Sequence, residues 1–487
     1  MQNTLDLQKH SLAADPEMSF VPILIQEIEL SKPLPTFSAF DKQRKQTYQR
    51  TRCVVRLHTQ PLGSVDLTLA LDELSPEEYA PRIWQTLGEQ INAHLREDDL
   101  PEVTGLDAAG LLTWHTPKCV QERQAFLQTA PFASVVISTH NRPTFLARCL
   151  SALLNLDYPY YEVIVVDNAP SSSATADFIQ QTYADEPKIR YVREDRPGSS
   201  SGRNRGILEA RGDIIAFTDD DVVVDTHWLT GLAMGFRATK NVACVTGLVL
   251  PLELETPTQF LFEIYGGFPR GFSRRIFDLR DHRWEEPGYP YILETYGVGA
   301  NIAFTASFLH REGGFDPALG PGSPTYSAED LALLFSVIVN GNHLVYEPAS
   351  LLYHQHRQNY TDLQKQLYGY AVGFTAYLTK IIVDHPLLTL DCINKVVTRM
   401  FFLARIRSSK PERETIPFRQ KLKRIERKGF LRGPLAYIQS RLACGWTRKG
   451  LSLVQTSTNA TGRKEVVPSV QPQESWFRGE GTDGCRD

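Results

Sequence analysis

The stretch GDIIAFTDDDVVVD, residues 212–225, ends a run of strand-forming apolar residues in three consecutive carboxylates, Asp219, Asp220 and Asp221. Adjacent anions repel one another, and each of them resists removal from water. Clustered aspartates are hard oxygen ligands that suit Mg²⁺ or Mn²⁺. The alternative is a solvated turn or helix cap, because Asp is common in turns. The triplet therefore raises the hypothesis of a divalent-cation site.

The surrounding segments predict how such a site is positioned. Apolar strand patterns in ASVVISTHNRP, YEVIVVDN, IRYVRED and DIIAFTDDD alternate with helical patterns of about ten residues between positions 133 and 221. This alternation predicts an α/β fold with a mainly parallel sheet and helices on both faces. In such sheets ligands bind at the carboxyl ends of the strands, where His140, Asn141, Asp167 and the three aspartates fall.

The order of these landmarks resembles that of the family 2 glycosyltransferases, whose fold is the Rossmann-like GT-A fold. STHNRP, EVIVVDN, SGRNRG and FTDDD follow one another as in that family, and GVGANIAF, SAEDLALLFSVIVNG and YEPASLLYH are similar to its later landmarks. The resemblance covers about residues 131–360, roughly half of the chain. It implies an enzyme that transfers a sugar from a nucleotide-sugar donor.

The resemblance also implies donor-binding roles. Asp167 suits a nucleobase because a carboxylate can accept from a ring N–H, although capping of its own turn is the alternative. Arg203 and Asn204 occupy the family's nucleotide contact, where an arginine can pair with diphosphate oxygens, although a surface arginine is the common case. The implied donor-binding residues are Thr139, His140, Asn141, Arg142, Asp167, Arg203, Asn204, Asp219 and Asp220.

A DxD pair of Asp219 and Asp221 would bind the cation, Mg²⁺ or Mn²⁺, with Asp221 as the best direct ligand. His354 follows the strand-like HLVYEPASLLY and matches a position where GT-A enzymes often supply a further ligand. His356 lies two residues on, and either histidine fits a solvent-facing residue as well.

Similarity to the family's ED motif implies that Asp330 is the general base and that Glu329 supports it or binds acceptor. Two acids that stabilise the helix dipole are the alternative. Gly299, Ala300 and Asn301 would lie on the acceptor side, although a plain loop before a strand is nearly as compatible. A single displacement would invert the anomeric centre. The QxxRW signature of processive members is absent, which favours transfer of one sugar per acceptor.

The remaining segments suggest the domain organisation. We expect residues 1–19 and 451–487 to be disordered, 20–128 to form an accessory α+β module, 129–385 the GT-A domain, and 386–450 a basic helical segment. Residues 405–450 hold fourteen Lys/Arg residues against three glutamates, interspersed with apolar residues. This pattern is typical both of a solvated helical face and of helices on an anionic membrane, and the family's use of lipid-linked acceptors favours the membrane.

Composition excludes several classes of protein. The net charge of −4 gives no reason to expect nucleic acid as a partner. Seven cysteines (Cys53, Cys119, Cys149, Cys244, Cys392, Cys444 and Cys485) lack CxxC pairs or Cys/His metal spacing, which argues against disulfides or a zinc module. No signal peptide or membrane span is recognisable. We therefore expect a cytoplasmic location, with peripheral attachment to the cytoplasmic face of the membrane as the further expectation.

The function favoured by these observations is a metal-dependent, inverting glycosyltransferase whose acceptor is a hydroxyl of a glycan, a polysaccharide or a lipid-linked glycan. One alternative is a nucleotidyltransferase, but STHNRP is not the Gly-rich basic loop that would follow its first strand. The other is a catalytically silent sugar- or nucleotide-binding scaffold, which would more often have lost Asp219, Asp221 or Asp330.

Overall fold

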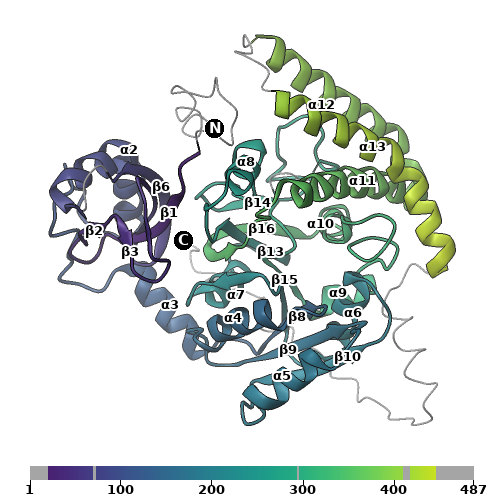
Figure 1. Ribbon diagram of the computed structural model, residues 1–487, viewed down its shortest axis with the longest axis horizontal. Helices are drawn as coiled ribbons and strands as arrows, with labels where there is room; N and C mark the ends of the chain where they lie inside the picture. Colours follow the sequence, from purple (N-terminus) through teal and green to yellow (C-terminus); the bar gives the residue numbers. More distant parts are fainter. Residues whose placement is uncertain (1–19, 70–72, 293–295, 410–416, 446–487) are drawn as a thin grey trace, which may run out of the picture.

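The computed structural model describes residues 20–69, 73–292, 296–409 and 417–445 (Figure 1). The terminal segments expected to be disordered, residues 1–19 and 451–487, lie outside the described residues.

The described strands and helices follow the predicted alternation. The strands are β1 (Ile23–Glu29), β2 (Phe37–Ser38), β3 (Phe40–Asp41), β4 (Gln46–Thr47), β5 (Arg50–Leu57), β6 (Gln60–Thr68), β7 (Glu73–Leu74), β8 (Ala133–Thr139), β9 (Tyr161–Asn168), β10 (Ile189–Glu194), β11 (Ile214–Thr218), β12 (Val222–Val224), β13 (Val242–Pro251), β14 (Arg275–Phe277), β15 (Ile302–Thr305) and β16 (His343–His354). The helices are α2 (Pro76–Glu97), α3 (Lys118–Gln128), α4 (Pro143–Leu154), α5 (Ala174–Tyr183), α6 (Ser199–Glu209), α7 (Trp228–Gly235), α8 (Pro257–Tyr265), α9 (Ala306–Glu312), α10 (Glu329–Val339), α11 (Tyr360–Asp384), the 3₁₀ helix η2 (Pro386–Leu388), α12 (Thr389–Ser409) and α13 (Pro417–Cys444).

The central sheet has the order β10-β9-β8-β11-β15-β13-β16-β12, with β14 paired to β16. Strands β10, β9, β8 and β11 are parallel, β15 is antiparallel to both of its neighbours, and β13 and β16 are parallel again. The prediction of an α/β fold with a mainly parallel sheet is therefore confirmed. The chain leaves β8 toward β10 and returns to β11 on the other side of β8, so a ligand crevice is expected where β8 and β11 end.

Helices cover both faces of this sheet, as the strand sequences require. Val135 and Ile137 of β8 pack with helices α4, α5 and α7, whereas Val136 between them packs with α6, α9 and α10. Because successive side chains of a strand point to opposite faces, a strand buried on both sides has a continuous apolar sequence. The two hydrophobic layers hold the strand ends in fixed positions.

The first part of the chain forms a separate small sheet, β1-β5-β6, covered by α2. The N-cap of helix α2 is Ser75, whose backbone N–H donates to the side chain of Glu78. This module contacts the central sheet through Arg56 of β5, whose guanidinium donates to Glu27 and, over 2.7 Å, to Asp225 just past β12. The accessory module is thereby joined to the strand that follows the aspartate triplet.

The last helices lie against the central domain at the upper right of Figure 1. Helix α13 packs closely on α11 because Gly429 and Gly433 leave no side chain between the two backbones. The buried guanidinium of Arg441 donates to Asp316, to which Lys380 of α11 is also paired at 2.9 Å. None of the described helices is long and apolar enough to cross a membrane.

Gly231 in α7 is a position where packing permits no side chain. A Cβ there would lie 2.6 Å from the backbone nitrogen of Ser350 in β16, so helix and strand would have to separate. We expect Gly231→Ala to lower the free energy of unfolding by about 1–3 kcal/mol, measured by urea denaturation. Gly105→Ala is the control, because no atom lies within 4 Å of the added carbon. Equal stability of the two variants would contradict this packing account.

Candidate active site

The end of β8 and the loop after it donate hydrogen bonds to the aspartate triplet. Thr139 Oγ1 donates to Asp220 Oδ2 over 2.7 Å, and Arg142 donates to Asp220 over 2.6 Å and to Asp221 over 2.9 Å. These contacts form because β8 and β11 are parallel neighbours that end side by side. Burial raises the pKa of Asp220 to about 6, and the charge of Arg142 opposes this. Both oxygens of Asp220 are engaged, so this carboxylate anchors the loop and Arg142.

Strand pairing brings His354 to the triplet from a distant part of the sequence. β12 is antiparallel to β16, with Val222 opposite His354, so His354 Nε2 lies 3.3 Å from Asp221 Oδ1. Burial lowers the pKa of His354, with Asp221 opposing. Burial acts to raise the pKa of Asp221, but His354 and Arg142 outweigh it and hold this pKa below its usual value. The pair is thus an ionised, buried carboxylate in contact with an imidazole whose charged form is opposed by burial and favoured by Asp221.

Asp219, Asp221 and His354 form a group that fits a divalent cation. One ligand atom from each lies within 4.8 Å of the others. Asp221 and His354 are buried, whereas the side chain of Asp219 is 38% exposed, so the group is open to solvent on one side. Within the described residues the buried Nδ1 of His354 has no hydrogen-bond partner. Two carboxylates and an imidazole in an open site are a donor set for Mn²⁺ or Mg²⁺.

Arg203 connects the triplet to the start of α10. Its guanidinium donates to Asp219 over 3.2 Å and to Glu329 over 2.9 Å. Glu329 is buried, and burial raises its pKa to about 7, while the charge of Arg203 acts in the opposite direction. A single guanidinium therefore sets the spacing between the candidate metal ligands and the two acids of α10.

Asp330 follows Glu329 and is held by backbone donors. Asp330 Oδ2 accepts from Gly299 N–H over 2.8 Å, and Oδ1 accepts from its neighbour Leu331 N–H. A Cβ on residue 299 would lie 2.8 Å from Asp330 Oδ2, so only glycine lets the loop approach this carboxylate. The N-cap of the helix is Ala328, in a left-handed conformation with φ 79°. The structure thus brings Gly299 and Asp330 into direct contact.

Asp167 at the end of β9 forms a separate acceptor position. Its Oδ2 accepts from the Tyr191 hydroxyl over 2.9 Å, whereas Oδ1 is buried and has no hydrogen-bond partner among the described residues. Burial raises the pKa of Asp167, with the hydrogen bond from Tyr191 opposing. His140 Nδ1 lies 2.7 Å from the Asn168 carbonyl oxygen, and Asn141 Nδ2 lies 3.0 Å from His140 Nε2. The loop after β8 therefore lies beside the buried carboxylate.

Three of the sequence-predicted residues use their polar groups inside the protein. The amide of Asn204 exchanges two hydrogen bonds with the backbone of Phe315. The carbonyl of Ala300 accepts from Thr218. Asn301 is fully buried, accepts from Trp228 Nε1 and donates to two backbone carbonyls. The side chains of Asn204 and Asn301 thus hold loops and are not brought to the site surface.

Arg357 is a residue that sequence reasoning missed. Its guanidinium lies 3.9 Å from Asp221 Oδ2. Its position three residues after His354, within QHRQNY, was the available signal.

The carboxylates around the site outnumber the guanidinium groups. Five carboxylates meet three guanidinium groups, and when all five are ionised two negative charges remain, which is the charge that one divalent cation balances. The carboxylates belong to Asp219, Asp220, Asp221, Glu329 and Asp330, and the guanidinium groups to Arg142, Arg203 and Arg357.

Comparison with known proteins agrees with this geometry. Residues 134–281 match the family model described as glycosyl transferase family 2. This match spans β8 to β14 and includes the triplet. Residues 134–281 are therefore similar to a family 2 glycosyltransferase domain, and the α/β sheet that they enter is of the mainly parallel kind that the sequence predicts.

Curated relatives carry related names. The chain is 28% identical over 256 residues to the pre-mycofactocin glycosyltransferase of Mycobacterium tuberculosis. The aligned region makes up 52% of this chain and 48% of that protein. It is 25% identical over 195 residues to the glucosyl-dolichyl phosphate glucuronosyltransferase of Haloferax volcanii, 38% of this chain and 56% of that protein. The chain spans about half the length of the curated relatives it matches.

A similar solved structure is the mannosyltransferase PcManGT of Pyrobaculum calidifontis in complex with GDP-Man and Mn²⁺, with 17% identity, a TM-score of 0.42, and coverage of 68% of this chain and 81% of that one. Another is Staphylococcus aureus TarS 1-349 in complex with UDP-GlcNAc, with 14% identity, a TM-score of 0.37, and coverage of 63% and 81%.

The Arg203–Glu329 pair predicts a pH-dependent stability defect. The pKa of Glu329 is about 7 in the folded protein, against an ordinary 4.5, so the folded protein holds this proton more tightly than the unfolded chain does. The stability gained from this proton is therefore full below about pH 4.5 and is lost as the pH rises to about 7. Arg203→Met removes the opposing charge, so we expect a loss of about 3–5 kcal/mol at pH 8 and a smaller loss at pH 5, measured by urea unfolding with chelator present.

The matched control is the double variant Arg203→Met/Glu329→Gln, whose loss should not depend on pH because no buried carboxylate remains at this position. An equal loss at both pH values in the single variant would show that the ion pair does not control the charge of Glu329.

Proposed function

We propose that this protein is a metal-dependent, inverting glycosyltransferase that moves one sugar from a nucleoside diphosphate to a hydroxyl of its acceptor. The observation that carries the proposal is the link made by Arg203, which joins a candidate cation site to the acids of α10 within a family 2 domain. A donor bound at the first group would have its reacting carbon near the second.

On the donor side, Asp167 would accept from the ring N–H of the base. Its buried Oδ1 supports this role, because Thr175 lies near the carboxylate but Oδ1 has no hydrogen bond of good geometry among the described residues, and such a buried acceptor is costly unless a ligand satisfies it. Thr139, His140, Asn141 and Arg142 would enclose the base and ribose, and Asp220 would hold Arg142 in place. Arg203 would approach the diphosphate, while Asn204 would support it by fixing the loop at Phe315.

Asp219, Asp221 and His354 would hold Mn²⁺ or Mg²⁺ together with the diphosphate. When bound, the cation would neutralise charge on the departing nucleoside diphosphate as a Lewis acid. The excess of two negative charges supports this requirement, since the arginines of the site leave the carboxylates incompletely balanced.

On the acceptor side, Asp330 would take the proton from the attacking hydroxyl. The N–H groups of Gly299 and Leu331 fix the orientation of this carboxylate, and a fixed orientation is the geometric requirement for a general base. Glu329 would position Arg203. Attack by the hydroxyl on the face opposite the leaving diphosphate inverts the anomeric centre, as in other single displacements at this carbon. The acceptor would be a glycan or a lipid-linked glycan.

The two carboxylate groups predict separable defects. Asp330→Asn keeps the shape of the side chain but not its basicity, so we expect donor binding within about twofold of the wild type and a loss of transfer of about a hundredfold or more. Asp221→Ala should instead abolish metal-dependent binding of the donor. Binding is measured by calorimetry, and transfer by release of nucleoside diphosphate with candidate acceptors.

The matched control is Asp225→Asn, which lies four residues from Asp221 and pairs with Arg56 outside the site. It should leave the metal dependence of donor binding unchanged. Transfer retained by purified Asp330→Asn would remove the base assignment, and transfer absent from the wild type with every donor would favour a silent binding scaffold.

We further propose that α13 attaches the protein to an anionic membrane surface, where a lipid-linked acceptor would be found. Side chains on one exposed face follow each other at intervals of three and four residues, which places them along a single stripe. The stripe consists of Lys421, Arg424, Lys428, Leu431, Leu435, Ile438 and Leu442. Its first half is basic and its second half is apolar, with Leu431 85% exposed, a combination that fits anionic headgroups and the acyl boundary.

The stripe predicts loss of vesicle binding on removal of its leucines. Leu431→Ser/Leu435→Ser should weaken cosedimentation with phosphatidylcholine–phosphatidylglycerol vesicles more than tenfold, because burial of two leucines contributes about 3 kcal/mol or more. Leu112→Ser is the control, since this leucine is 62% exposed on the accessory module. Equal binding of the wild type to vesicles with and without phosphatidylglycerol would argue against an electrostatic contribution from the basic half.

A further inference from the structure

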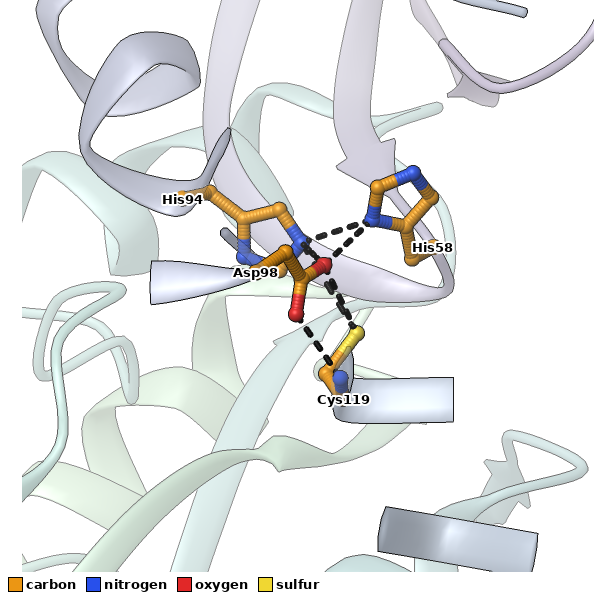
Figure 2. Close-up of side chains that lie close together, drawn as sticks. All are labelled: His58, His94, Asp98 and Cys119. Atoms are coloured by element: carbon orange, nitrogen blue, oxygen red, sulfur yellow. Dashed lines mark hydrogen bonds and ion pairs between the residues drawn. The ribbon is translucent and has the colours of Figure 1, made fainter. Parts of the chain in front are cut away.

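A second cluster of metal-ligating side chains lies in the accessory module, apart from the active site. His58, His94, Asp98 and Cys119 each point one ligand atom toward the others (Figure 2). They come from three segments: the turn between β5 and β6, the carboxyl end of α2, and the first turn of α3. His58, His94 and Asp98 are buried and Cys119 is half-buried.

The distances between the four ligand atoms approach those of a tetrahedral site. Tetrahedral zinc with bonds of about 2.0–2.3 Å separates its ligand atoms by about 3.3–3.6 Å. Here His58 Nδ1 lies 3.1 Å from His94 Nε2 and 2.7 Å from Asp98 Oδ2, and Asp98 Oδ2 lies 3.2 Å from His94 Nε2. Cys119 Sγ lies 3.1 Å from Asp98 Oδ2 and 4.0 Å from His94 Nε2. All four atoms lie within 4.8 Å of one another.

The backbone conformation at His58 is one that histidine adopts only at a cost in energy. His58 and Thr59 form the two-residue connection between β5 and β6, with φ 53° and 72°. Such turns favour Asn and Gly, because the left-handed conformation costs other residues about 1–2 kcal/mol each. The His-Thr turn is therefore strained at both residues, and it places the imidazole of His58 in the cluster.

Charge also favours a cation at the centre of the cluster. One carboxylate and one thiolate would balance a divalent cation, so the buried site would carry no net charge. Binding would release the thiol proton of Cys119, as zinc binding by cysteine requires.

We propose that His58, His94, Asp98 and Cys119 bind one structural Zn²⁺ that fastens α2 and the β5–β6 turn to α3. Four protein ligands leave no open position for substrate, which is the pattern of structural zinc sites. Mixed imidazole, thiolate and carboxylate ligands at tetrahedral spacing select zinc over Mg²⁺ or Ca²⁺. Supporting contacts surround the ligands: Cys119 N–H donates to Asp98 Oδ1 over 2.7 Å, and His58 N–H donates to Glu29 over 3.0 Å.

The site would link the accessory module to the glycosyltransferase domain. Helix α3 leads directly into β8, and its Arg123 donates to Thr59 Oγ1 in the turn that carries His58. The same module contacts Asp225 through Arg56, as described above. Loss of the zinc should therefore loosen the position of the module more than it disturbs either core.

The experiment is metal analysis of the purified full-length chain after incubation with excess Zn²⁺ and desalting, followed by exchange with Co²⁺. We expect about one zinc per chain, and a thiolate-to-Co²⁺ charge-transfer band with the visible spectrum of tetrahedral cobalt. Cys119→Ala and Asp98→Asn should each reduce zinc retention about tenfold or more and abolish or weaken this band. Adding chelator should lower the unfolding temperature of the wild type but not of Cys119→Ala.

Cys53→Ala is the matched control, because Cys53 is a buried thiol of the same module that lies outside the cluster. Asp221→Ala separates this site from the active-site group, and both variants should retain zinc. The proposal would be overturned if wild-type protein retained far less than one zinc per chain, or if Cys119→Ala retained as much as the wild type. The cluster would then be a network of hydrogen bonds alone.

Discussion

The position of most functional side chains in this protein depends on how three adjacent carboxylates are kept together at the end of β11. Asp219 meets Arg203, Asp220 meets Arg142 and Thr139, and Asp221 meets Arg142 and His354. Because like charges in a partly buried site repel strongly, these partners must be held rigidly, and they come from separate parts of the sequence. The central sheet supplies that rigidity, since β8 and β16 place their carboxyl ends beside the triplet. The arginines offset most of the repulsion, and the remaining excess of negative charge is what makes a cation part of the proposed donor site.

The same sheet ends receive support from outside the segment that matches the family model. The accessory module contacts the segment just past β12 through Arg56 and Asp225, four residues from the proposed metal ligand Asp221. Tyr353 of β16 donates to Glu27 of β1, next to His354. If zinc fastens the module to α3, then one metal maintains the scaffold and another, bound with the donor, takes part in the reaction. The zinc site in the module would be closed by four protein ligands, whereas the active-site group has three ligands and is open to solvent at Asp219.

The parallel part of the fold could be predicted from the sequence because its strands are buried on both faces and so have continuous apolar sequences. Thr139, Asp167 and the triplet could be placed together, since strand ends in such a sheet converge. The contacts of Asn204 and Asn301 could not be predicted from motifs alone, because tertiary contacts with Phe315 and Trp228 decide the direction of these side chains. The cluster of His58, His94, Asp98 and Cys119 could not be predicted from the sequence for a related reason. Its residues lack the short spacings of common zinc motifs, and the hairpin and two helices bring them together only in the folded chain.

The central claim is that the acidic group at the end of β11 binds a nucleoside diphosphate together with a divalent cation. Its most direct test is calorimetric titration of UDP, GDP, CDP and dTDP into the purified protein, with and without Mn²⁺. The account predicts that one diphosphate binds, that binding requires Mn²⁺, and that Asp221→Ala removes it. Binding of none of the four by folded protein, or binding of equal strength without the metal, would contradict it.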